Sequence, residues 1–200
     1  MSESHLICPP YNYLRDAKIY NKKDEIVPWH WIEENADILV LLFTAKGIDK
    51  DGIIENFYKI YENVKHRNFP LEVIYVPTDE TEDDMKACYE EQANWFTLKL
   101  SDSLVPALMY IYEITCIPHV LVINVNGSVI SKHGLIDLVE YGKNAVVSWL
   151  STSGPTKNHR RVSKDAAMYG TEWRFHNAFK PHAQYKKKFS DLAEATSKET

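Results

Sequence analysis

Six consecutive apolar residues, Ile38 to Phe43, limit the folds open to this chain more than any other part of the sequence. The run is too short for a helix of ordinary length and too apolar for a strand with one face in water. It therefore predicts a strand buried on both faces, as occurs in the middle of sheets that carry helices on each side. A second apolar run, Leu71 to Pro77, predicts a second buried strand.

An amphipathic helix is predicted directly after the first buried strand. Its apolar residues recur at helical spacing and are Ile54, Phe57, Tyr58 and Tyr61. The helix should end near His66. Asp49 and Asp51 precede this helix, and either carboxylate is well placed to cap its positive end. A strand that runs into a helix N-terminus is a favourable place for a reactive group.

The remaining patterns complete an α/β fold with a central mixed sheet flanked by helices. We expect a first strand over 13–20 and a short helix with Pro28 at its first position. The Asn126-Gly127 pair is the strongest short-range hairpin signal and predicts an antiparallel pair. The other predicted strands cover 120–125 and 128–131, and the other predicted helices cover 82–93, 103–112 and 136–150. The last of these helices has Val139, Val146, Val147 and Leu150 on one side.

Charge is divided unevenly between the two parts of the chain. Residues 1–150 carry 13 basic and 23 acidic side chains, whereas residues 151–200 carry 10 and 5. An acidic body argues against a nucleic-acid-binding domain. No apolar stretch approaches the length of a membrane span, and the N-terminus does not resemble a signal peptide. We therefore expect no membrane partner and a cytoplasmic location.

The three cysteines and the acidic run over 79–84 do not predict a metal site. Cys8, Cys88 and Cys116 have unrelated spacings, which suit neither a disulfide framework nor zinc. The acidic run follows a buried strand and precedes a helix, where carboxylates favour the helix start. We expect no metal and no cofactor.

Several motifs together resemble the nucleoredoxin/tryparedoxin branch of the thioredoxin-like proteins. They are Leu41–Ala45, Glu72–Asp79, Glu82–Met85, Asn94–Phe96, Ile117–Pro118, Asn126–Ile130, Gly134, Tyr141–Gly142 and Trp149. The resemblance covers about residues 13–151 and implies a thioredoxin-like fold. The resemblance also implies the family's activity, which is protein-disulfide reduction. Resemblance to nucleoredoxin in particular implies regulation of Wnt signalling and a partly nuclear location.

The sequence departs from this family at the reactive positions. Aligned on residues 43–45, the family's Trp-Cys-Pro-Pro-Cys motif falls on Gly47, Ile48, Asp49, Lys50 and Asp51, so neither cysteine is present. Leu42 stands where thioredoxins keep a buried aspartate. Because dithiol exchange needs a thiolate and a second thiol nearby, we predict that the usual reduction cycle is lost.

The loop before the last buried strand is the predicted binding site. In thioredoxin-like proteins the loop matching Ile117, Pro118 and His119 binds extended peptide by main-chain hydrogen bonds, which requires no cysteine. A proline directly before a buried strand also suggests a cis peptide bond. His119 replaces the family's common Thr. It can form a polar patch or weak metal site with Asp49 and Asp51, or simply lie in a solvated rim.

Cys116 is the one thiol placed near this loop, two residues before Pro118. It can act alone in mixed disulfides, or it can be a small residue where the family often has Gly. Cys88 falls within a predicted helix and is expected to be buried and inert. Nothing positions Cys8.

Three segments are expected: an N-terminal tail over 1–12, a domain over 13–151 and a C-terminal extension over 152–200. The extension interleaves aromatic and basic side chains, with Trp173 and Lys186 as examples. One interpretation is a disordered tail or one folded against its own domain. The other is a recognition segment for a partner protein.

The sequence thus favours a redox-inactive, thioredoxin-like module that binds protein partners through the Pro118 loop, as a monomer or weak oligomer. An enzyme remains the alternative: a thiol-disulfide oxidoreductase of nucleoredoxin type that works through Cys116.

Overall fold

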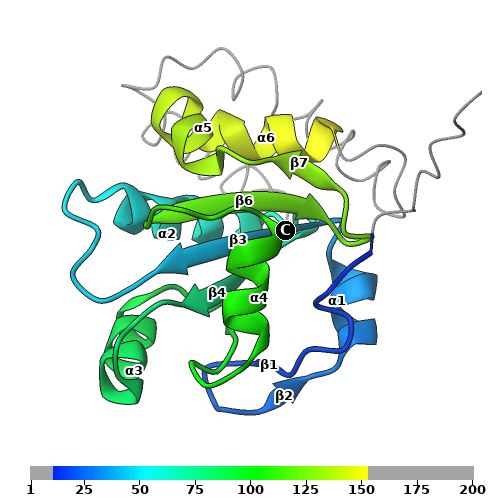
Figure 1. Cartoon of the computed structure of the whole chain (residues 1–200). Helices are drawn as coiled ribbons and strands as arrows, with labels where there is room; N and C mark the ends of the chain where they lie inside the picture. Colours follow the sequence, from blue (N-terminus) through cyan, green and yellow to red (C-terminus); the bar gives the residue numbers. More distant parts are fainter. Residues whose placement is uncertain (1–10, 153–200) are drawn as a thin grey trace, which may run out of the picture. The chain divides into compact units, whose positions relative to one another are not determined.

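A seven-stranded mixed sheet forms the centre of the fold (Figure 1). The computed structural model describes residues 11–152, so the predictions for Cys8 and for the aromatic and basic extension fall outside the described residues. The strands lie in the spatial order β2-β1-β5-β4-β3-β6-β7. Their bounds are β1 (Ile19–Tyr20), β2 (Ile26–Val27), β3 (Ile38–Thr44), β4 (Leu71–Pro77), β5 (Phe96–Thr97), β6 (His119–Asn124) and β7 (Val129–Ser131).

Strand β3 is the central strand that its apolar run predicts. All seven of its residues are buried. It pairs in parallel with β4, from Ile38 opposite Leu71 to Thr44 opposite Pro77, and antiparallel with β6. Both of its edges are hydrogen-bonded and both of its faces are covered, which is why the run needs no polar residue.

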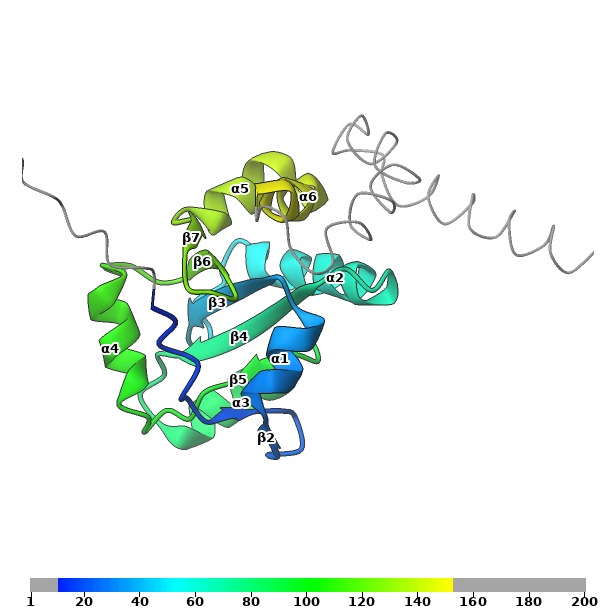
Figure 2. The same ribbon diagram turned by 90° about the vertical axis from the view of Figure 1, so that its right-hand side faces the viewer.

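Helices cover both faces of this sheet (Figures 1 and 2). Helix α4 lies on one face, and α2 lies on the other with α5 and α6. On the α4 face, alternate residues of β3 such as Leu41 pack with Ile32 of α1 and Leu108 of α4. The helices are α1 (Trp29–Asn35), α2 (Ile53–His66), α3 (Glu82–Glu91), α4 (Leu104–Ile111), α5 (Gly134–Tyr141) and α6 (Lys143–Thr152). Over residues 11–152, none of these helices has the length and apolar character needed to cross a bilayer.

The predicted first strand over 13–20 is wrong in extent, because only Ile19 and Tyr20 form a strand. Asn12 explains the difference. Its side-chain oxygen accepts a hydrogen bond from Leu14 N at 2.9 Å, which folds this segment into turns. Strands β2 and β5, of two residues each, were not predicted, since so short a segment carries no periodicity.

The predicted helix over 136–150 is two helices. The chain breaks at Gly142, which has a φ of 53°, so α5 and α6 run in different directions. Residues on the two sides of the break therefore do not share one face. Val139 of α5 is 62% exposed, whereas Val146 and Leu150 of α6 are buried.

The predicted hairpin between β6 and β7 is confirmed, and the segment before β1 packs against it. The amide nitrogen of the Asn12 side chain donates to Val125 O at 2.6 Å. Gly127 has a φ of 92°, and a Cβ there would lie 2.7 Å from the backbone oxygen of Tyr11. Only glycine provides both the backbone conformation and the space.

Gly127→Ala is expected to lower the free energy of unfolding by more than Gly47→Ala. Both glycines have positive φ, so each substitution costs about 1–2 kcal/mol of backbone strain. Only at Gly127 does the added methyl also meet backbone atoms, because nothing lies within 4 Å of the Gly47 position. Urea unfolding followed by tryptophan fluorescence measures the difference. Equal losses for the two variants would contradict the close packing of the N-terminal segment on the hairpin.

Candidate functional site

Three loops meet at one end of the sheet (Figure 1). Strands β3 and β4 are parallel, so the loops that leave them start at the same edge. Strand β6 is antiparallel to β3, and His119 at its start lies opposite Phe43 near the end of β3. The loops are the β3–α2 loop (45–52), the β4–α3 loop (78–81) and the α4–β6 loop (112–118), called the proline loop below.

The proline loop is anchored at both ends and offers unpaired backbone groups between them. Ile114 N donates to Met109 O at 2.8 Å, and β6 begins at His119. The peptide bond between Ile117 and Pro118 is cis. Within residues 11–152, the backbone groups of Cys116 and Ile117 make no hydrogen bond to another backbone group. Such groups need a partner when they are covered.

A pocket of about 430 Å³ opens beside the proline loop. Its volume falls in the lower part of the range of about 300–1,000 Å³ that is usual for ligand sites. Most of its lining is apolar. The pocket is formed by Pro77, Thr78, Asp79, Leu100, Val105, Pro106, Met109, Thr115, Cys116 and Ile117.

Asp79 fixes the start of the β3–α2 loop. Its Oδ1 accepts a hydrogen bond from Lys46 N at 2.8 Å, and its Oδ2 accepts one from the Tyr75 hydroxyl. The Lys46 side chain pairs with Asp84 at 2.9 Å, and this hydrogen bond raises the pKa of Lys46. One carboxylate therefore joins the β3–α2 loop to the end of β4.

Asp49 fixes the other end of the same loop. Its Oδ2 accepts a hydrogen bond from Glu55 N, in the first turn of α2, at 3.0 Å. The predicted carboxylate cap is confirmed for Asp49, although the N-cap position itself is Gly52. The helix end that stabilises a thiolate in dithiol enzymes is thus satisfied here by a carboxylate.

The two cysteines of the described residues lie outside the β3–α2 loop and form no disulfide. Cys88 is buried in α3, as predicted, and its sulfur accepts a hydrogen bond from the Gln92 side chain at 3.2 Å. Burial raises the pKa of the Cys88 thiol, which keeps it protonated. Cys116 is exposed and lines the pocket. This arrangement provides one accessible thiol and no dithiol pair.

His119 is half-buried beside Phe43, with its ring centroid 6.3 Å from the Phe43 ring in an edge-on arrangement. Burial lowers the pKa of His119, while a hydrogen bond with the backbone of Lys132 acts in the opposite direction. Its Nε2 atom is buried and has no hydrogen-bond partner in the described part of the chain. His119 therefore contacts the apolar end of β3 and does not lie in a solvated rim.

The acidic run after β4 caps α3. The Thr81 hydroxyl accepts a hydrogen bond from Asp84 N at 3.1 Å, which confirms the predicted capped helix start. Among residues 11–152, no group of three His, Cys, Asp or Glu side chains is placed to hold a metal ion.

Comparisons with known proteins agree with this architecture. Residues 35–129 match the family model described as thioredoxin-like. Thioredoxin from Wuchereria bancrofti superposes with a TM-score of 0.58 at 22% identity, covering 69% of this chain and 96% of that protein. Tryparedoxin from Trypanosoma brucei gives 0.58 and 22%, covering 68% and 92%. Tryparedoxin I from Leishmania major gives 0.55 and 22%, covering 63% and 86%. The chain therefore has a thioredoxin-like fold, and the predicted fold class is confirmed.

Sequence reasoning named the proline loop but missed most of the pocket. Val105, Pro106 and Met109 of α4 line it together with Pro77 at the end of β4, a proximity that only tertiary packing creates. Asp79 was also missed as a structural residue. The position of Asp79 shortly after a long buried strand could have predicted this role, because residues there lie at the edge of the sheet where the loops meet.

His119→Gln is expected to remove part of the acid sensitivity of the domain. A neutral ring is favoured in the folded state, so the unfolded chain binds the proton more readily below the ordinary pKa of about 6.5. The stabilising contribution is complete above that pH and is lost as the pH falls through the lowered folded-state pKa. Urea midpoints at about pH 7.5 and pH 5.5 measure the loss. His30→Gln, at an exposed position of α1, is the control and should behave as the wild type.

Proposed function

We propose that this thioredoxin-like domain binds extended protein segments at the proline loop and no longer carries out dithiol exchange. One observation supports the binding role most directly. The backbone groups of Cys116 and Ile117 have no backbone partner in the described structure, and they border an apolar pocket. An extended peptide can pair with such groups as an added strand while one of its side chains enters the pocket.

The loss of dithiol chemistry rests on the β3–α2 loop. Thioredoxins and tryparedoxins, the proteins with similar structures, are redox proteins of this fold. In this chain Gly47, Ile48, Asp49, Lys50 and Asp51 occupy the corresponding loop, and no thiol is present there to start or resolve a mixed disulfide.

The proposal also includes the type of protein and its location in the cell. We assign it to the nucleoredoxin type, as a regulatory module that recognises protein partners in the cytoplasm and also in the nucleus. The resemblance of its motifs to that branch supports this assignment, and an acidic domain suits protein partners better than nucleic acid.

Ile117→Glu is expected to abolish peptide binding, because it places a charge where an apolar side chain lines the pocket. The probe is a set of peptides selected on the wild-type domain from a random displayed library. Val139→Glu is the matched control, since Val139 is an exposed valine on α5 and should retain binding. Peptides that bind Ile117→Glu as tightly as the wild type would place the site elsewhere.

A second function remains open to Cys116, because its thiol is exposed at the pocket. There its thiolate can attack oxidised glutathione or a partner's disulfide, which forms a mixed disulfide and releases the other sulfur as a thiol, without a resolving thiol in this chain. This is the monothiol oxidoreductase alternative.

Reduction of insulin driven by dithiothreitol distinguishes the two functions. We expect the wild type to show no rate above background, since the β3–α2 loop holds no thiol to start the exchange. A reactive Cys116 would instead form the mixed disulfide with insulin, and dithiothreitol would resolve it. Cys116→Ser is measured beside it. A rate in the wild type that Cys116→Ser abolishes would move the chemistry to the proline loop and contradict the binding-only role.

A further inference from the structure

We infer that the segment bound at the proline loop is basic: an apolar side chain enters the pocket, and lysine or arginine residues stand next to it. This inference rests on the proposed function and adds the chemical class of the partner.

The pocket selects an apolar side chain because its few polar groups are unsuited to a charged one. The lining residues of α4 are Val105, Pro106 and Met109, and Ile117 closes the other side. The one carboxylate in the lining, Asp79, already accepts hydrogen bonds from Lys46 N and the Tyr75 hydroxyl. A buried cation there would compete with those donors for the carboxylate, at a cost in desolvation.

The surroundings of the pocket carry uncompensated negative charge. Glu80, Glu82 and Asp83 are exposed, and within residues 11–152 none of them forms an ion pair. Glu80 directly follows Asp79, which lines the pocket, and Glu82 and Asp83 begin α3 within four residues of Asp79. A side chain next to the one in the pocket therefore meets carboxylates that lack a partner.

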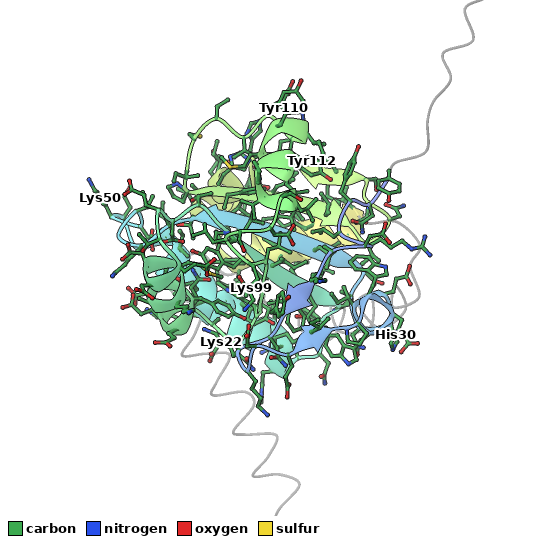
Figure 3. All side chains as sticks on the ribbon, turned by 60° about the horizontal axis from the view of Figure 1, so that its bottom comes forward. Lys22, His30, Lys50, Lys99, Tyr110 and Tyr112 are labelled. Atoms are coloured by element: carbon green, nitrogen blue, oxygen red, sulfur yellow. The ribbon has the colours of Figure 1, made fainter. Side chains whose placement is uncertain are left out.

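The nearby lysines balance this charge only in part. Lys86, one turn after Glu82 in α3, sets one positive charge against the three carboxylates. Lys46 is already paired with Asp84. Lys50 extends outward from the β3–α2 loop (Figure 3). It stands between Asp49 and Asp51 in that loop. The β3–α2 loop contains as many carboxylates as lysines. The sign of the electrostatic potential at the pocket is therefore set by the carboxylates of the β4–α3 loop and of the first turn of α3.

Charge complementarity thus favours a basic segment over a neutral one and opposes an acidic one. Exposed ion pairs are individually weak because water and salt screen them, and oppositely charged surfaces also speed association. Two or three such pairs correspond to a gain in affinity of about three- to tenfold.

The experiment uses three short, fluorescently labelled peptides that share a central leucine. The residues on either side of the leucine are lysine in the first, serine in the second and glutamate in the third. We expect affinity for the full-length protein to fall in that order, about three- to tenfold from lysine to serine. Raising the salt concentration should remove most of the difference, because exposed charges are screened.

A double substitution assigns the preference to the carboxylates. Glu82→Gln with Asp83→Asn should reduce the advantage of the lysine peptide at least twofold and leave the serine peptide unchanged. Glu33→Gln with Glu34→Gln makes the same change in net charge on the exposed face of α1 and should leave the preference intact.

The two ways of failing are distinct. If none of the three peptides and no library peptide binds, the proposed function itself is contradicted. If peptides bind and are lost with Ile117→Glu, but lysine, serine and glutamate peptides bind equally at low salt, only the basic specificity is overturned. A preference that the Glu33/Glu34 variant reduces equally would also overturn it, since net charge alone would then be responsible.

Discussion

The rest of the fold depends on β3 being hydrogen-bonded along both edges and buried on both faces. Burying each large apolar side chain of this strand contributes about 1.5–3 kcal/mol relative to exposure. Its parallel partner β4 and antiparallel partner β6 are aligned with it over nearly its full length. The loops that leave one end of these three strands therefore start from fixed positions, and they form a site even though none of them is a regular element.

The two parts of that site depend on different residues. The pocket and the proline loop are built from β4, α4 and the segment before β6, and none of Gly47 to Asp51 lines the pocket. The β3–α2 loop is held separately, by Asp79 at Lys46 and by Asp49 at Glu55. The proposed peptide-binding surface therefore does not depend on the residues that stand where the family has its cysteines. This separation is consistent with the proposed binding function in a domain whose β3–α2 loop holds no thiol.

Long apolar runs and strong turn signals made much of the fold predictable. The buried strands β3 and β4 and the Asn126-Gly127 hairpin follow from local sequence alone. The two-residue strands could not be predicted, because pairing with neighbours and not periodicity defines them. The break at Gly142 was missed because the apolar residues around it continue at helical spacing. For the site, Ile117 was predicted from the resemblance, whereas Met109 and Asp79 become site residues only through tertiary packing.

The hydrogen bond from Glu55 N to Asp49 has a consequence for how this site relates to redox-active domains. A helix N-terminus has few free amide groups, and a thiolate and a carboxylate compete for the same ones. In this chain a carboxylate has taken that place and neutralises the helix end from within. Cysteines placed at positions 48 and 51, which match the family's motif, would leave Asp49 and its hydrogen bond in place. Because this carboxylate already occupies the helix end, that end would lower the pKa of a new thiol at position 48 less than a free helix end does.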